Sequence, residues 1–269
     1  MIESLENKKV KDWTRLHLKK YRDHNYLILD KEVLLEAYKQ GYLDTLIYCG
    51  QRPFDFDKAY EVSRVVLNKI SKRDDLDYIG VGKEIEEKRE YCSRIMMLDE
   101  LSDPLNIGRI MECAYLFGFD TILLSENCAD IYHPKCLSAS KGAIYHLNIL
   151  RGNLVEQIKD LKEKDYIIYA TGLKENSLFL DEVNKSPKMA FVLGNEGSGV
   201  SKEVFISVDE TVKIQMHNID SLNVAMAGSI IMYRFLVENL KVLFLFTWYF
   251  FKIIVFDSNE VSNFEAIYA

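Results

Sequence analysis

The sequence predicts an α/β protein in which a small α/β domain precedes a larger domain with a parallel sheet. Short apolar, β-branched runs alternate with segments whose apolar residues recur at helical spacing, the order that βαβ units require. Two of these units, at 191–201 and 213–232, pass from an apolar strand through a turn with glycine or asparagine into a helix. Such turns at the carboxyl ends of parallel strands form the ligand crevice of an open α/β sheet.

The first domain is expected to span residues 1–82. Charged residues dominate 1–25, where a helix is expected to bury Val10, Trp13, Leu16 and Leu18 in part. This helix is either a solvated surface element or a basic helix that faces RNA. Hydrophobic periodicity then predicts, in order, strand 26–29, helix 31–40, strand 45–48, helix 57–70 and strand 78–82. A charged run without an apolar stripe follows and predicts an interdomain linker at 83–91.

The second domain is expected to span residues 92–239. Asp103 and Pro104 predict the start of a helix, as its N-cap and first-turn proline. The glycines of 194–199 permit tight or left-handed backbone after strand 191–193. Ser221 is expected to cap the last helix, 224–238. The remaining predicted elements are strand 95–98, strand 121–125, surface helix 153–162, strand 166–171 and strand 212–216.

Composition limits the classes of function. The 269 residues carry a formal net charge of -7, which argues against nucleic-acid binding by bulk charge and leaves room for a local basic patch. The five cysteines form no CxxC pair and have no histidine at a metal-ligand spacing. We therefore expect reduced thiols, no metal and, without a signal peptide, a cytoplasmic protein.

Residues 240–269 differ in character from the rest of the chain. The run 241–256 is aromatic and apolar, yet it has only sixteen residues and includes Lys252. A membrane span needs about 20 apolar residues, so no membrane insertion is expected. The tail is either an element packed on a subunit surface or out-of-frame sequence after a frameshift near Asn239. We favour the second interpretation, because such a patch is an aggregation liability.

Three motifs carry a resemblance to a known family. They are DPLNIG at 103–108, LGNEGSG at 193–199, and the pair IQM at 214–216 and SLNVA at 221–225. In this order and spacing they resemble the SpoU/TrmH family of RNA ribose 2′-O-methyltransferases, within the SPOUT superfamily. The resemblance is strong over about 90–238 and looser in the N-terminal third.

The resemblance implies a fold, a reaction and partners. The fold would be a Rossmann-like methyltransferase domain with a trefoil knot, attached to an N-terminal substrate-binding domain and assembled as a homodimer. The reaction would be methyl transfer from S-adenosyl-L-methionine to a ribose hydroxyl of RNA. An attached N-terminal domain favours rRNA over tRNA as the substrate.

The resemblance also assigns site residues. Backbone and apolar groups would hold the cofactor at Gly194, Asn195, Gly197, Ile214, Met216 and Leu222. The residues beside the reacting hydroxyl would be Asn106, Arg109, Glu196, Ser221 and Asn223. The basic residues expected to contact RNA are Lys9, Arg15, Lys19, Lys20 and Lys141. For Glu196 and Asn223, the alternative is that each only caps its own turn.

One position departs from the family pattern. The family usually has an arginine six residues after Asn106, and Glu112 occupies that position here. Arg109 lies one helical turn earlier on a shared face, and it or Lys141 could compensate. Three hypotheses follow: an active enzyme, a degenerate relative that binds S-adenosylmethionine or RNA without efficient transfer, and an unrelated nucleotide-binding α/β protein.

Overall fold

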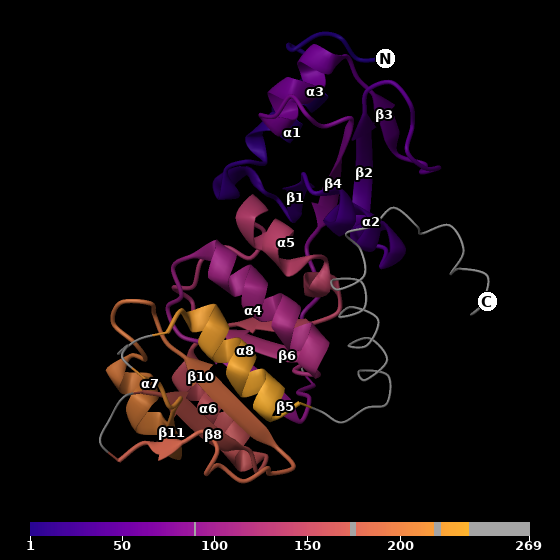
Figure 1. Ribbon diagram of the computed structural model, residues 1–269. Coiled ribbons are helices and arrows are strands. Elements are labelled where there is room, and N and C mark those ends of the chain that lie inside the picture. The colour runs from indigo at the N-terminus through magenta and orange to yellow at the C-terminus, as the bar shows by residue number, and fades with distance from the viewer. Residues whose placement is uncertain (89, 173–175, 218–221, 237–269) are drawn as a thin grey trace, which may run out of the picture.

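The computed structural model describes residues 1–88, 90–172, 176–217 and 222–236. Figure 1 shows a small N-terminal domain above a larger C-terminal domain, with α5 (Pro134–Ser140) facing the small domain. The predicted boundaries at 1–82, 83–91 and 92–239 stay predictions. The predictions about Ser221 and about the tail at 240–269 lie outside the described residues.

The small domain is a mixed α/β unit. Its four-stranded sheet has the order β1-β4-β2-β3, in which β4 is antiparallel to both β1 and β2, and β3 is parallel to β2. Its elements are α1 (Lys8–Arg15), η1 (Lys19–Tyr21), β1 (Asn25–Ile28), α2 (Lys31–Lys39), β2 (Leu43–Tyr48), β3 (Ala59–Glu61), α3 (Arg64–Ser71) and β4 (Tyr78–Lys83).

The predicted helix 57–70 is wrong in its first half. Residues 59–61 form β3, which pairs with β2 through the registers Leu46↔Ala59 to Tyr48↔Glu61. Helix α3 begins only after Ser63, whose hydroxyl accepts a hydrogen bond from the backbone of Val66. Pairing with a neighbouring strand satisfies the backbone groups of 59–61, an alternative that helical periodicity in the sequence does not reveal.

The large domain has a seven-stranded sheet in which every strand pair is parallel, in the order β7-β6-β5-β10-β8-β11-β9. Its strands are β5 (Arg94–Leu98), β6 (Thr121–Leu124), β7 (Asn148–Arg151), β8 (Ile167–Thr171), β9 (Leu178–Phe179), β10 (Met189–Leu193) and β11 (Glu210–Lys213). The sequence did not predict β7 or β9.

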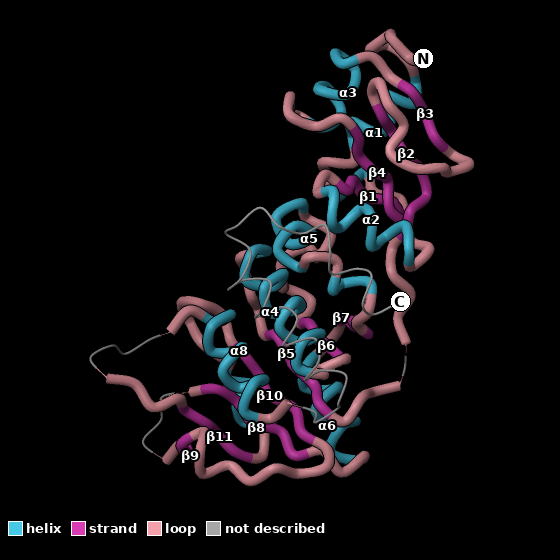
Figure 2. Tube along the Cα trace, turned by 45° about the vertical axis from the view of Figure 1, so that its right-hand side comes forward, coloured by secondary structure: helices cyan, strands magenta, loops and turns pink. Residues whose placement is uncertain are grey.

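Helices cover both faces of this sheet. Met96 and Leu98 of β5 pack in one core with α4 (Pro104–Phe117), α5 and α8 (Val224–Arg234). Ile95 and Met97 point to the other face, where α6 (Leu154–Glu163) and α7 (Lys202–Ser207) pack. Figure 2 shows α8 beside α4 on one side of the strands. The helix predicted at 153–162 is not merely a surface element, because α6 buries three apolar side chains.

The N-terminal end of α4 confirms the predicted start of that helix. The Asp103 carboxylate accepts a hydrogen bond from the Leu105 backbone at 3.0 Å, and Pro104 occupies the first turn. A Cβ at Gly108 would lie 2.4 Å from the carbonyl oxygen of Cys136. Glycine at this position therefore lets α4 and α5 approach backbone to backbone.

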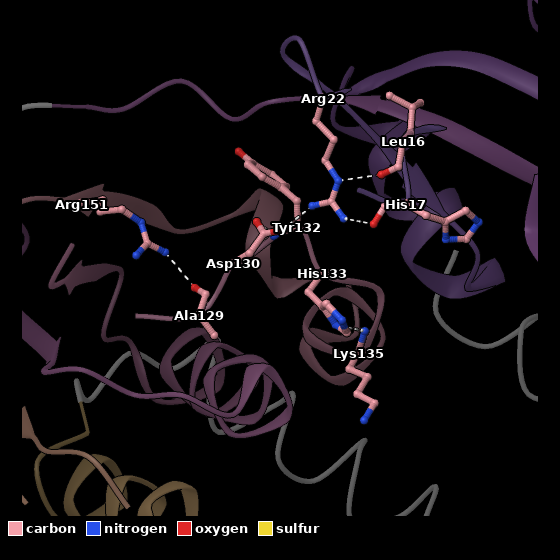
Figure 3. Close-up of polar contacts among 9 residues, drawn as sticks. All are labelled: Leu16, His17, Arg22, Ala129, Asp130, Tyr132, His133, Lys135 and Arg151. Carbon is pink, nitrogen blue, oxygen red and sulfur yellow. Dashed lines mark hydrogen bonds and ion pairs between the residues drawn. The ribbon is translucent and has the colours of Figure 1, made fainter. Parts of the chain in front are cut away.

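The two domains share a packed junction. Arg22 forms an ion pair with Asp130 of the large domain and donates to the carbonyl of Leu16 at 2.7 Å (Figure 3). The Tyr26 ring stacks on Tyr132 with ring centroids 4.3 Å apart, and both domains contribute to one hydrophobic core. The predicted linker is also anchored, since the Ile85 backbone donates to the Tyr132 hydroxyl at 2.8 Å. The packing fixes how one domain is placed against the other.

Three features of the described ranges bear on function. None of their helices is long and apolar enough to cross a membrane. No group of three or more His, Cys, Asp or Glu residues in those ranges could hold a metal ion. All five cysteines are free thiols. The trefoil knot implied by the resemblance stays a prediction.

Candidate functional site

A cavity of about 540 Å³, here called the glycine-turn cavity, opens at the carboxyl ends of β8, β10 and β11. Its walls are Thr171 and Gly172 at the end of β8, residues 193–199 at the end of β10, residues 212–214 with Met216, and one side of α8 together with the two residues before it. All six predicted cofactor residues line it: Gly194, Asn195, Gly197, Ile214, Met216 and Leu222. The two late strand–turn–helix units thus meet where the sequence places a ligand crevice.

The turn after β10 is a tightly closed loop. The backbones of Asn195 and Gly199 exchange two hydrogen bonds, of 3.0 and 2.9 Å. A Cβ at Gly194 would lie 2.1 Å from the nitrogen of Val200, so no other residue fits there without movement of the backbone. Gly199 has φ of 73°, in the left-handed region. The turn therefore presents backbone rather than side chains to the cavity.

Asn195 holds this turn in place. Its side-chain oxygen accepts hydrogen bonds from the backbones of Gly197 and Ser198, at 2.9 and 3.2 Å. Its amide nitrogen donates to the carbonyl of Glu100 at 2.8 Å. The Asn195 side chain is thus occupied by the protein itself, and any contact with a ligand would come from its backbone.

Three polar side chains from distant parts of the sequence meet beside the cavity. Asn106 Nδ2 donates to Glu196 Oε1 at 3.1 Å, and Asn106 Oδ1 accepts from Asn223 Nδ2 at 3.2 Å. The amide of Asn106 is therefore oriented from both sides. This polar triplet, Asn106–Glu196–Asn223, links the start of α4, the glycine turn and the start of α8.

The Glu196 carboxylate also sits over the N-terminus of α4. It accepts hydrogen bonds from the hydroxyl of Ser102 at 3.2 Å and from the backbones of Ser102 and Asp103, each at 3.4 Å. Burial raises the pKa of Glu196, but the hydrogen bonds from Asn106 and from this backbone outweigh it and lower the pKa below its ordinary value. Glu196 is therefore an ionised hydrogen-bond acceptor, and it does not merely cap its own turn.

Asn223 is the N-cap of α8. Its side-chain oxygen accepts from the backbones of Ala225 and Met226, at 3.0 and 3.3 Å. The helix begins directly after Asn223, and the predicted role of Ser221 lies outside the described residues. The side-chain oxygen of Asn223 therefore does cap its own helix, as the alternative interpretation expected, while its amide nitrogen donates to Asn106. The last helix also ends earlier than expected, at Arg234.

The predicted strand 212–216 is shifted. Strand β11 spans Glu210–Lys213, and Ile214 and Met216 follow it in irregular backbone. Parallel pairing with β8 extends only to Val212, and pairing with β9 ends at Lys213. The apolar side chains beyond that point line the cavity instead of extending the sheet.

Sequence reasoning missed Asp99, which supports the glycine turn. Asp99 follows β5 directly, is 2% exposed, and accepts a hydrogen bond from the Ser201 backbone at 2.7 Å. It also missed Thr171, whose hydroxyl donates to the carbonyl of Val192 at 3.0 Å. A carboxylate at the carboxyl end of an apolar strand was the available signal for Asp99.

Arg109 and Glu112 line a different hollow. This second cavity, of about 550 Å³, lies between the two domains and is here called the interdomain cavity. Lys141 also lines it, with its ammonium 3.3 Å from Glu32 of α2. Arg109, the proposed replacement for the usual arginine, is thus absent from the walls of the glycine-turn cavity.

The basic residues near the N-terminus lie on the small domain. Helix α1 buries Val10 and Trp13, so its charged side faces solvent and both interpretations of residues 1–25 stay open. The expected burial of Leu18 is wrong, because Leu18 lies beyond the end of α1 and is 53% exposed. The Lys9 ammonium stacks on the Tyr60 ring at 3.8 Å, and Lys20 lies 4.9 Å from the Tyr21 ring. The other two predicted RNA contacts there are Arg15, near Asp12, and Lys19 in η1. Figure 1 shows α1 far from α8.

Comparisons with known proteins agree with this geometry. The profile of the SpoU rRNA Methylase family matches residues 93–233. Over 243 residues, 87% of this chain and 98% of the relative, the chain is 28% identical to the 23S rRNA (guanosine(2553)-2'-O)-methyltransferase RlmP of Bacillus subtilis (strain 168).

Solved structures share the whole architecture. An RNA 2'-O ribose methyltransferase superposes with a TM-score of 0.73 at 26% identity, over 87% of this chain and 96% of the other. An rRNA methyltransferase from Sinorhizobium meliloti superposes with a TM-score of 0.78 at 24% identity, over 87% and 95% of the two chains, and shows the same fold. Because the matched segment 93–233 spans more than half of the sequence, the chain belongs to the SpoU rRNA methylase family.

Proposed function

We propose that this protein transfers a methyl group from S-adenosyl-L-methionine to a ribose 2′-hydroxyl of rRNA. The observation that carries the proposal is the polar triplet beside the glycine-turn cavity. Oriented hydrogen-bonding groups thus lie next to a cavity large enough for a nucleoside. The relative from Bacillus subtilis, which aligns over nearly its whole length, bears the name of a 23S rRNA 2'-O-methyltransferase.

The cavity suits the cofactor in size and chemistry. Its volume of about 540 Å³ lies within the usual range for ligand pockets, about 300–1,000 Å³. Ile214, Met216 and Leu222 supply apolar surface for a purine, and the backbone of 194–199 supplies hydrogen-bonding groups. When bound, S-adenosylmethionine supplies an electrophilic methyl group. A Sinorhizobium meliloti enzyme of this fold has been solved with AdoMet bound.

The polar triplet would hold the acceptor ribose. Asn106, fixed by its two partners, can position a hydroxyl, and orientation of this kind lowers the barrier by restricting the reactants before they react. Glu196 would act through hydrogen bonding rather than as a strong base, because its lowered pKa makes it a weak proton acceptor. Ser221 joins this set only through the resemblance.

A homodimer is part of the proposal. Met226, Ile230 and Tyr233 on α8 are 58%, 42% and 62% exposed, which gives this helix an apolar outer face. Such a face, on a helix that borders the glycine-turn cavity, suits contact with a second copy of the chain. Light scattering would show twice the mass of one chain, and a Tyr233→Glu variant would shift the protein toward the monomer.

Methyl transfer to deproteinised rRNA, followed with tritium-labelled cofactor, tests the proposal. Transfer to rRNA but not to tRNA is the expected result. Calorimetry without binding of S-adenosylmethionine would overturn both the enzyme and the degenerate binder. Binding without transfer would instead support the degenerate relative, which Glu112 in place of the usual arginine favours. An Arg109→Ala variant with unchanged turnover would remove Arg109 from the mechanism.

A further inference from the structure

The interdomain cavity contains charged groups that the fold leaves unused. The side chains of Arg109, Lys135 and Glu112 form no hydrogen bond or ion pair with any residue that the structure describes. Figure 3 shows the Lys135 side chain extending away from the other labelled residues. The remaining charges of the cavity have partners: Arg73 pairs with Asp75, and Lys141 with Glu32.

Glu112 differs from the exposed carboxylates of the surface. It is half-buried, and burial raises its pKa although the nearby charges of Lys141 and Arg109 favour its ionised form. The cavity wall around it includes Leu29, Leu105 and Leu137. A half-buried carboxylate in a partly apolar pocket gains most from a ligand that supplies two N–H donors.

Asp30, the other carboxylate of the cavity, is already satisfied. Its Oδ1 accepts from the backbones of Glu32 and Val33, at 3.0 and 3.2 Å, and its Oδ2 accepts from the hydroxyl of Ser138 at 3.1 Å. Glu112 is therefore the carboxylate of this cavity that is available to a ligand, with two oxygens side by side.

The unused groups match one kind of nucleotide. Arg109 and Lys135 provide positive charge for a phosphate, and the leucines provide surface for a base. Guanine carries two adjacent N–H donors on its Watson–Crick edge, which a carboxylate can accept together, whereas adenine, cytosine and uracil each carry donors at only one position of that edge. The Glu112 carboxylate, as an acceptor for two adjacent N–H donors, therefore favours guanine over the other three bases.

The position of the cavity relates it to the acceptor site. Arg109 lies three residues after Asn106 on α4, a rise of about 4.5 Å along the helix axis. Neither Arg109 nor Glu112 lines the glycine-turn cavity, which the proposed function gives to the cofactor, so the interdomain cavity is a separate hollow that is free to take a nucleotide of the RNA. We propose that the interdomain cavity binds an unpaired guanosine of the substrate RNA, next to the methylated nucleotide, with Glu112 as the residue that selects the base. This inference rests on the proposed function for the identity of its ligand.

Binding of short RNAs tests the inference without methyl transfer. The probes are fluorescent nine-nucleotide oligouridines whose central base is guanine, hypoxanthine, adenine or cytosine, and anisotropy reports their affinity. Hypoxanthine lacks only the 2-amino donor, so the inosine probe should bind about tenfold more weakly than the guanosine probe, the factor expected for one hydrogen bond to a charged group. Adenosine and cytidine should bind at least as weakly as inosine.

Variants locate the selection. Glu112→Gln should abolish the preference for guanosine over inosine, while Glu156→Gln on α6, across the sheet from the cavity, should retain it. Arg109→Gln should weaken the binding of all four probes alike. It should also reduce the slope of log affinity against log salt concentration by the amount expected for about one phosphate contact. Thermal unfolding checks that each variant is folded.

The outcomes separate this inference from the proposed function. Equal binding of the four probes by the unmodified protein, or an intact guanosine preference in Glu112→Gln, overturns the inference whether or not rRNA is methylated. Failure of methyl transfer with an intact preference that depends on Glu112 overturns the proposed reaction and leaves the guanosine site standing.

Discussion

Replacing Gly194 by alanine is expected to open the glycine turn and weaken cofactor binding. The new Cβ would lie 2.1 Å from the nitrogen of Val200 and 2.2 Å from the carbonyl carbon of Gly199. Both are backbone atoms, so no side-chain rotation can relieve the overlap. Carbon atoms pack at about 3.5–4.0 Å, and the turn must therefore move by more than about 1 Å.

The size of the effect follows from that displacement. Overpacking of a rigid site costs about 1–3 kcal/mol, which in a protein of this size lowers Tm by about 2–10 °C. The turn also forms one wall of the glycine-turn cavity, so its displacement should reduce the affinity for S-adenosylmethionine at least about tenfold. Differential scanning fluorimetry and calorimetry measure the two quantities.

Gly197→Ala is the matched control. Its Cβ would lie 3.5 Å from Asn195 Oδ1, an ordinary contact, and Gly197 is not among the glycines with positive φ. This variant should keep the Tm and the cofactor affinity close to those of the parent protein. Equal Tm and equal affinity in the Gly194→Ala and Gly197→Ala variants would refute the account of the turn.

Three further predictions concern the contacts around the site and between the domains. Asn223→Ala should cost about 1 kcal/mol of stability and also lower methyl transfer, whereas Asn153→Ala, which removes the equivalent cap of α6, should cost as much and leave transfer unchanged. Arg22→Ala should cost about 3 kcal/mol in urea unfolding, the lower end of the range for a buried pair, because the partly buried Asp130 loses its partner, and replacing both residues by apolar ones should recover part of the loss. Because folding lowers the pKa of Glu196, its contribution to stability is present above the ordinary carboxyl value of about 4.3 and is lost as the pH falls through the lowered value, so Glu196→Gln should flatten this acid limb of the stability profile.

Local patterns in the sequence were enough for several features. Asp103 followed by Pro104 predicted the start of α4, and the glycines of 194–199 predicted a turn that only bare backbone can form. Both depend on side chains and backbone within a few residues of one another, and such effects are fixed by the local sequence. The three motifs together also gave the family.

Other features depend on partners that are distant in the sequence. Residues 59–61 form a strand because they pair with β2. Ile214 lies outside the sheet because the pairing of β11 with β8 and β9 ends at Val212 and Lys213. Glu112 could be recognised in the sequence only as a departure from a pattern. Its place in a cavity between two domains follows from the packing of α5 against α4 on one side and against α2 and β1 of the small domain on the other.

The sequence by itself determined most of the alternation of strands and helices, the start of α4 at Asp103, and the composition of the glycine turn, because each is decided by short-range hydrogen bonding and steric limits. The tertiary structure alone decided that Asn106 meets Glu196 and Asn223, and that Arg109 faces a second cavity. Hydrogen bonds between residues about 90 or more positions apart form only when the sheet brings the ends of its strands together, and no local pattern encodes that geometry.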